Sequence, residues 1–172
     1  MSNKHRWAKR LAQLVVAASA LIGIAWGEQT VANASTLAIP DISEWQGKLT
    51  ASQVSNLKSQ VSFVINRRQY GSSYQDLYAT NNTALYVKYG IPFGEYDYAR
   101  FTSAASAKQE AEDFYNRSNK SAAFYALDFE EDDVTSGTTN AAVKAWYDEM
   151  RSLTGKNLVF YSYQSFATTY AS

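Results

Sequence analysis

The sequence contains no cysteine and a single histidine, His5, among its 172 residues. Without cysteine, disulfide bonds and thiolate metal sites are excluded. Because His5 lies within the first few residues, a histidine-based catalytic triad or zinc site is excluded from the rest of the chain. We therefore expect no cofactor and no metal site. Any hydrolytic chemistry must come from carboxylates.

The sequence also lacks an excess of charge of one sign, since 16 Lys and Arg residues balance 16 Asp and Glu residues. Residues 1–34 hold four basic residues and one acid, which leaves residues 35–172 with 12 basic and 15 acidic residues and a net charge of −3. A mildly acidic body without a basic stripe is a poor partner for nucleic acid, so no nucleic-acid binding is expected. In contrast, tyrosine is abundant, with 13 residues. Tyrosine rings stack on sugars, although they fill cores equally well.

Residues 1–34 have the pattern of a secretory signal peptide. A basic start precedes an apolar run over residues 11–26, and Ala32–Ala34 matches the A-x-A cleavage pattern. An uncleaved membrane anchor is the alternative, but this run of 16 residues is shorter than the roughly 20 that span a bilayer. We therefore expect cleavage after Ala34 and a mature chain of residues 35–172 without stable membrane association. The product would be secreted or extracellular, with association with the cell wall as a further option.

From residue 35 onward, short apolar segments alternate with segments of helical spacing. Strands are predicted over Leu37–Ile42, Val61–Asn66, Phe93–Tyr98, Ala122–Asp128 and Leu158–Tyr163. Helices are predicted over Thr50–Leu57, Asp76–Tyr89, Ser103–Arg117 and Thr138–Leu153, with a helical start over Ser165–Tyr170 and a loop over Arg67–Tyr74. This alternation predicts an α/β fold with a parallel sheet and the helices outside it.

In barrels built from alternating parallel strands and helices, the site lies at the carboxyl ends of the strands. Polar residues gather at those ends in this sequence: Asp41, Arg67, Arg68, Asp97, Arg100, Asp128, Glu130 and Tyr161.

The most informative stretch is F-Y-A-L-D-F-E-E-D-D over residues 124–133. Side chains two apart on a strand share a face, so Asp128 and Glu130 should project together and Phe129 to the opposite side. Acids at the end of an apolar strand are costly unless they are paired or used. Two carboxylates in one pocket push their pKa values apart, so that one acts as an acid while the other stays ionised.

A solvated acidic turn is the alternative interpretation of this stretch. We expect such a turn for Glu131, Asp132 and Asp133, and we expect Glu110 and Glu112 to lie on the surface of a helix.

Four short motifs follow one another between residues 38 and 163. They are D-I-S-E-W-Q-G at residues 41–47, F-V-I-N-R with a following Y-G between residues 63 and 71, G-E-Y-D-Y-A-R at residues 94–100, and L-D-F-E at residues 127–130. Together they resemble the motifs of the glycoside hydrolase family 25 lysozymes, the Chalaropsis-type muramidases. The family 18 chitinases also end a strand with D-x-E, but Ala123 and Ala126 stand where that family has two further aspartates.

The resemblance implies a TIM-like, flattened (β/α) barrel that hydrolyses the β-1,4 bond between N-acetylmuramic acid and N-acetylglucosamine in peptidoglycan glycan strands. It implies that Glu130 is the general acid that protonates the leaving oxygen. Asp128 would stabilise the developing positive charge or orient a substrate acetamido group, and Asp41 would keep the network ionised. Nucleophilic attack, water activation and substrate-assisted attack all fit these carboxylates.

Five further residues are predicted to bind the substrate: Tyr96, Tyr98, Tyr161, Arg67 and Gln46. Core packing is the alternative for the tyrosines, and a structural ion pair is the alternative for Arg67. Gln46 could instead fix the first loop. We expect the protein to be a monomer.

Family barrels have eight strands, whereas residues 35–172 supply about the first five strand–helix units. We therefore expect a catalytic domain without its C-terminal strands, either as a fragment of a longer protein, which we favour, or as a truncated product. The alternative function is an inactive remnant that at most binds peptidoglycan. The intact set Asp41, Asp128 and Glu130 favours an enzyme.

Overall fold

The computed structural model describes residues 37–166, which belong to one compact unit. Its strands are β1 (Asp41–Ile42), β2 (Val64–Tyr70), β3 (Tyr74–Gln75), β4 (Phe93–Tyr98), β5 (Phe124–Asp128) and β6 (Asn157–Tyr161). Within the described part of the chain they form one sheet in the order β1-β2-β4-β5-β6, with β3 attached to β2. Every neighbouring pair is parallel except β2 and β3, so the predicted α/β fold with a parallel sheet is confirmed.

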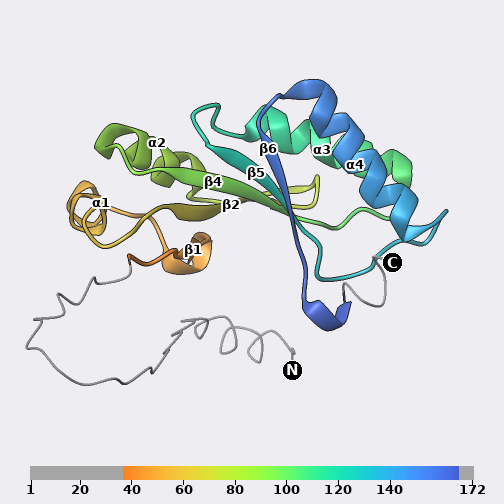
Figure 1. Cartoon of the computed structure of the whole chain (residues 1–172), viewed down its shortest axis with the longest axis horizontal. Helices are drawn as coiled ribbons and strands as arrows, with labels where there is room; N and C mark the ends of the chain where they lie inside the picture. Colours follow the sequence, from red (N-terminus) through yellow and green to blue (C-terminus); the bar gives the residue numbers. More distant parts are fainter. Residues whose placement is uncertain (1–36, 167–172) are drawn as a thin grey trace, which may run out of the picture. The chain divides into compact units, whose positions relative to one another are not determined.

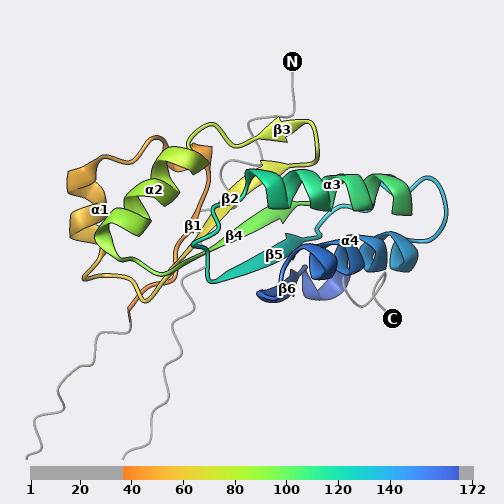
Figure 2. The same ribbon diagram turned by 90° about the horizontal axis from the view of Figure 1, so that it is seen from above.

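Helices connect the parallel strands. They are α1 (Ala51–Leu57), α2 (Ala79–Tyr89), α3 (Ala104–Arg117) and α4 (Thr139–Leu153), and a short 3₁₀ helix, η2 (Glu44–Gln46), follows β1. Hydroxyl groups of Thr50, Ser103 and Thr138 accept hydrogen bonds from backbone N–H groups and cap α1, α3 and α4. Helices α2, α3 and α4 lie on one face of the sheet (Figures 1 and 2).

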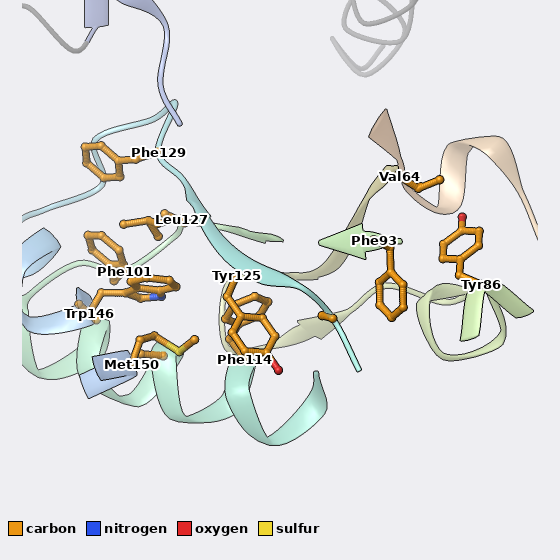
Figure 3. Packing of buried hydrophobic residues seen from close by; sticks show 14 of the residues in the cluster. Val64, Tyr86, Phe93, Phe101, Phe114, Tyr125, Leu127, Phe129, Trp146 and Met150 are labelled. Atoms are coloured by element: carbon orange, nitrogen blue, oxygen red, sulfur yellow. The ribbon is translucent and has the colours of Figure 1, made fainter. Parts of the chain in front are cut away.

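The main packing is between this helical layer and the sheet. Tyr125 and Leu127 of β5 are buried together with Phe114 of α3 and Trp146 of α4 (Figure 3). Because side chains alternate along a strand, Ala126 and Asp128 of β5 belong to the opposite face of the sheet. The core therefore fixes which side of the sheet presents the carboxylates.

Two predicted boundaries near the start of the sheet are wrong. The first strand is shorter than Leu37–Ile42, because Pro40 has no N–H to donate to a ladder, and Ala38 makes only an isolated bridge with Val61. The predicted helix over Asp76–Tyr89 begins only at Ala79.

The predicted loop over Arg67–Tyr74 is also wrong, because β2 continues to Tyr70 and pairs with β3. The charged and polar residues of this segment are typical of a loop, but here they belong to a strand and their side chains are hydrogen-bonded inside the protein. Arg68 is 1% exposed and its Nε donates to Glu95 Oε1 over 2.9 Å, while Gln69 Nε2 donates to Asp97 Oδ1 over 3.0 Å.

A register shift in β2 between Arg67 and Gln69 explains why these two neighbours both contact the helical side. Arg68 hydrogen-bonds Thr83 of α2, and Gln69 donates to the backbone oxygen of Glu110 in α3. An extra residue of this kind re-aims the following side chains. Tyr70 then stacks on Tyr98, with ring centroids 4.8 Å apart.

Two buried carboxylates correct further expectations. Asp97, expected at the rim, is fully buried in the helical layer and accepts a hydrogen bond of 2.9 Å from Trp146 Nε1. Glu110, expected on the surface, is 2% exposed, and its Oε1 accepts from the backbone N–H of Arg100 over 2.9 Å. Helical periodicity alone did not reveal that Glu110 faces the sheet.

The predicted signal peptide, residues 1–34, lies outside the described residues. Of the helical start predicted over Ser165–Tyr170, residues 165 and 166 are helical and the remainder lies outside the described part. Within residues 37–166, none of the helices has both the length and the apolar character needed to cross a bilayer.

Close packing on the face of the sheet opposite the helices gives a first prediction. A Cβ added to Gly94 of β4 would lie 2.2 Å from the ring of Phe124, so we expect Gly94→Ala to destabilise the fold by about 1–3 kcal/mol through overpacking. Urea unfolding measures the change. Gly155→Ala is the control, since its Cβ would meet no atom within 4 Å, and equal unfolding free energies for the two variants would contradict the prediction.

Glu110 gives a prediction on pH. Burial is the main cause that raises its pKa from 4.5 to about 7, the charge of Asp113 adds to it, and the backbone N–H groups of Arg100 and Ser72 and the Arg100 charge oppose it. Because the folded state holds this proton more tightly, its contribution to stability is full below pH 4.5 and is lost as the pH rises through about 7. A shift of this size corresponds to about 3 kcal/mol.

We therefore expect Glu110→Gln, which resembles the protonated form, to lose less stability between pH 5 and pH 8 than the native protein. Chemical denaturation at a series of pH values measures this dependence. Glu112→Gln on the same helix is the control. An unchanged pH dependence in Glu110→Gln would contradict the assignment.

Candidate active site

The carboxyl end of β5 places two acids on the face of the sheet away from the helices. Asp128, 9% exposed, is in register with Tyr98 of β4 and Tyr161 of β6. The backbone N–H of Phe129 donates to the backbone oxygen of Tyr161 over 2.9 Å, and the Phe129 ring is buried in the core. The alternation predicted for Asp128, Phe129 and Glu130 is therefore present, and Glu130 follows as a partly exposed side chain.

The end of β1 adds a third acid. Tyr96 of β4 hydrogen-bonds the carboxylate of Asp41, and the charges of Asp41, Arg67 and Asp128 all act on Tyr96. The charges of Asp41 and Glu130 in turn act on Asp128. The structure thus brings together the three acids predicted from the sequence, from strands that are not neighbours in the sheet. We call Asp41, Asp128 and Glu130 the carboxylate cluster.

Asp128 is the most perturbed member of the carboxylate cluster. Burial raises its pKa to about 8, with additional increases from the charges of Glu130 and Asp41 and a decrease from the charge of Arg67. Its Oδ1 atom is buried and has no hydrogen-bond partner among the described residues. A carboxyl group that is buried beside two like charges retains its proton near neutral pH.

Loss of surrounding water also raises the pKa of the other two acids, although Asp41 is exposed and Glu130 partly exposed. For Asp41, the hydrogen bond from Tyr96 and the charge of Arg67 oppose this effect. For Glu130, the hydrogen bond from Tyr163 opposes it, whereas the charges of Asp41 and Glu131 add to it. Sequence analysis missed Tyr163, although it follows Tyr161 at a spacing of two.

Arg67 lies in β2, 9% exposed, and its charge lowers the pKa values of Asp41 and Asp128. Its guanidinium group also forms ion pairs with Asp76 over 3.1 Å and Glu44 over 3.4 Å. These contacts favour the structural ion pair over direct substrate contact. Asp76 is the residue expected to begin helix α2, and it is instead a buried partner of Arg67.

The turn η2 fixes the loop between β1 and α1. Gln46 Oε1 accepts a hydrogen bond of 2.7 Å from the backbone N–H of Ser43, and the Ser43 hydroxyl caps the turn in return. The backbone N–H of Glu44 donates to Asp76 Oδ2 over 2.8 Å. These contacts place Gln46 in a role that fixes the first loop, which was one of the two roles expected for it.

The predicted tyrosines differ in their surroundings. Tyr96 is 8% exposed beside Asp41, Tyr98 is half-buried and donates to Glu131 Oε1 over 2.9 Å, and Tyr161 is 45% exposed. Tyr96 and Tyr98 are two apart on β4 and share the face of the carboxylate cluster. The rim side chain of Tyr161 is the one most open to a ligand.

The acidic turn after Glu130 is not simply solvated. Arg100, at the end of β4, forms ion pairs with Glu131 over 2.9 Å and with Asp133 over 2.6 Å. Asp132 accepts from the backbone N–H of Val134 over 3.1 Å. The Glu131 and Asp133 side chains are still 41% and 29% exposed, so the turn is solvated and also ion-paired, with a partner from a distant loop that sequence spacing does not reveal.

Within residues 37–166, no group of three or more acidic or histidine side chains is arranged to hold a metal ion. The carboxylate cluster contains groups that can donate a proton and stabilise a positive charge. Such sets of carboxylates carry out glycoside hydrolysis.

Comparison with known families agrees with this chemistry. Residues 40–172 match the family model described as glycosyl hydrolases family 25. The chain belongs to glycosyl hydrolase family 25. It is therefore a member of a family of glycosidases, as its motifs predicted, and its sheet is the corresponding part of a TIM-like fold. Comparison with curated proteins gives no match.

Several solved structures resemble the chain. The catalytic domain of the endolysin Ply40, from a bacteriophage of Listeria monocytogenes, matches with 28% identity and a TM-score of 0.72, over 79% of this chain and 68% of that domain. GHIP of Streptococcus pneumoniae matches with 23% identity and a TM-score of 0.69, over 77% and 62%. The autolysin LytC of the same organism, in complex with a synthetic peptidoglycan ligand, matches with 23% identity and a TM-score of 0.63, over 76% and 33%. The chain thus spans between about one third and two thirds of these structures.

The contact between Tyr163 and Glu130 gives a prediction on the site. Tyr163→Phe removes a hydrogen bond that lowers the pKa of Glu130, so we expect that pKa to rise further above its ordinary value. Carbon-13 NMR titration of the Glu130 carboxyl group measures it. Tyr163 is 44% exposed, so the fold should be unaffected.

Tyr161→Phe is the matched control, because Tyr161 is equally exposed and the hydrogen bond that acts on Glu130 comes from Tyr163. The same shift in both variants, or no shift in Tyr163→Phe, would show that Tyr163 does not govern the titration of Glu130.

Proposed function

We propose that the chain is the catalytic part of a peptidoglycan hydrolase that cleaves the β-1,4 bond between N-acetylmuramic acid and N-acetylglucosamine. The observation that carries this proposal is the convergence of Asp41, Asp128 and Glu130, with the pKa of Asp128 raised to about 8. Such a cluster supplies a proton and a negative charge at the same point, which glycosidic bond cleavage requires.

We assign the proton donor to Glu130, because it is the more exposed of the two acids on β5 and the loop after it, and can reach a leaving oxygen. Asp128 lies deeper and, once ionised, stabilises the developing positive charge or holds the acetamido N–H of the substrate. Its unpartnered Oδ1 supports the second role. Asp41 sustains the shared negative charge of the carboxylate cluster.

Because these acids influence one another, the protons belong to the carboxylate cluster rather than to single residues. In the free protein Asp128 has a pKa of about 8 and is protonated at neutral pH. Productive binding then requires that this proton pass from Asp128 to Glu130 and from Glu130 to the leaving oxygen, which leaves Asp128 ionised. A positive charge developing on the sugar favours this change, since it lies against Asp128.

Four further residues have roles in this proposal, two in substrate contact and two in support of the carboxylate cluster. Tyr98 and Tyr161 contact sugar rings, Tyr96 orients Asp41, and Arg67 acts through its charge on the carboxylate cluster. The relatives support peptidoglycan as the substrate, since Ply40 is an endolysin and LytC is an autolysin solved with a peptidoglycan ligand.

The cellular role follows from the signal-peptide pattern of residues 1–34. We propose that residues 35–172 form a secreted monomer that acts on the cell wall. Cell-wall breakdown in growth, in competition or in lysis would all use this chemistry.

Binding without cleavage is the second candidate function. The chain spans 68% of the Ply40 domain and 62% of GHIP, so cleavage by residues 35–172 is itself a proposal, and binding alone is the alternative outcome. Measuring cleavage and binding in the same preparation distinguishes the two functions.

The test of the proposed function is the release of reducing ends from purified peptidoglycan. We expect the protein to release them and Glu130→Gln to be slower by about 10² to 10⁴-fold, the usual contribution of a general acid. Borohydride reduction and mass spectrometry of the products should identify reduced muramic acid at the new ends.

Glu112→Gln, a substitution on helix α3 away from the carboxylate cluster, should retain full activity. Equal rates for native protein and Glu130→Gln would refute the role of Glu130. No release by folded native protein that still binds peptidoglycan would favour the second candidate function.

A further inference from the structure

A large aromatic side chain on the turn that follows Asp41 in the sequence is exposed. Trp45 lies in the turn η2, four residues after Asp41, and is 71% exposed. The other tryptophan within residues 37–166, Trp146, is 1% exposed and donates its indole N–H to Asp97. An indole ring offers a large apolar face with a polar N–H, so an exposed tryptophan on a fixed turn is a candidate contact for a ligand.

The backbone that carries Trp45 is held on several sides. Ser43 and Gln46 form reciprocal caps, and the N–H of Gly47 donates to the oxygen of Glu44 over 2.9 Å. Glu44 is itself fixed, because its N–H binds Asp76 and its carboxylate accepts from the hydroxyl of Tyr74 over 2.6 Å. A ring presented from a fixed turn loses little conformational freedom on binding, which favours recognition.

The turn is coupled to the carboxylate cluster. Glu44 forms an ion pair with Arg67, whose charge acts on Asp41 and Asp128. At the opposite edge of the sheet, Tyr161 at the end of β6 is 45% exposed, and Tyr163, which follows β6, is 44% exposed. Exposed aromatic rings therefore lie at or just after the ends of β1 and β6, the outermost parallel strands of the described sheet, while the carboxylate cluster comes from β1, the end of β5 and the loop after it.

We propose that Trp45 is a stacking platform for a sugar ring of the glycan strand, outside the pair of sugars whose bond is cut. This inference rests on the proposed function and extends it to a distal subsite. A pyranose ring offers a face of C–H groups to the indole and polar edges to its surroundings, and the neighbours of Trp45 in the turn, Glu44 and Gln46, are polar. A protein partner would require a continuous surface of about 800 Å² on this chain, which a single ring on a three-residue turn does not supply.

The test compares Trp45→Ala and Trp45→Phe with the native full chain on peptidoglycan glycan fragments of two lengths. We expect Trp45→Ala to raise KM about tenfold for an octasaccharide, with kcat unchanged, and to have little effect on the shortest fragment that is cut. Trp45→Phe should retain most of the affinity. Tyr147→Ala is the control, because Tyr147 is 46% exposed but lies on helix α4 in the helical layer.

Equal KM values for native protein and Trp45→Ala on both fragments would overturn the inference while leaving the proposed function intact. An equal rise in KM on both fragments would do the same, because it would place the ring at the bond that is cut. A loss of thermal stability in Trp45→Ala that accounts for the change would also overturn it.

If native protein cuts neither fragment, the proposed function fails and binding alone decides the inference. Indole fluorescence is then titrated with the octasaccharide in native protein and in Trp45→Phe in parallel, so that the difference reports Trp45 alone. A saturable difference supports the platform. No difference, or binding to lipid vesicles that depends on Trp45 in place of glycan binding, overturns it.

Discussion

The burial of Asp128 beside two other carboxylates is the constraint on which the site depends. Desolvation and the charges of Glu130 and Asp41 disfavour ionisation of this group, and its Oδ1 has no partner among the described residues. The rest of the protein must therefore hold the acid in an environment that it would otherwise avoid. It does so through the packing of β5, whose Tyr125 and Leu127 anchor the strand in the core.

Ion pairs on both sides of Asp128 support the site. Arg67 moderates the pKa of Asp128 and is held by Asp76 and Glu44, and the same glutamate fixes the turn that presents Trp45. On the other side, Arg100 joins the loop after β4 to the loop after β5 through Glu131 and Asp133. A small number of ion pairs thus connects the carboxylate cluster with the loops around it.

Much of this arrangement could be predicted from the sequence, because alternation of apolar segments is a local signal. Strand β4, the extents of α3 and α4 and the shared face of Asp128 and Glu130 follow from residue spacing. The remainder depends on partners distant in the chain. Arg68 and Gln69 resemble loop residues in the sequence, because their hydrogen-bond acceptors, Glu95 and Asp97, lie about 28 positions away. Glu110 resembles a surface residue, because the sequence does not show which side of α3 packs against the sheet. The role of Tyr163 likewise becomes visible only with its contact to Glu130.

Asp128 keeps its proton near neutral pH because of its burial and its neighbours. Site-resolved carbon-13 NMR titration of the Asp128 carboxyl group measures this directly. We expect a midpoint of about 8 in the native protein, and a lower midpoint when Glu130 is replaced by Gln, because a neighbouring negative charge is then removed. A midpoint near the ordinary value of about 4 in the native protein, unchanged by that substitution, would contradict it.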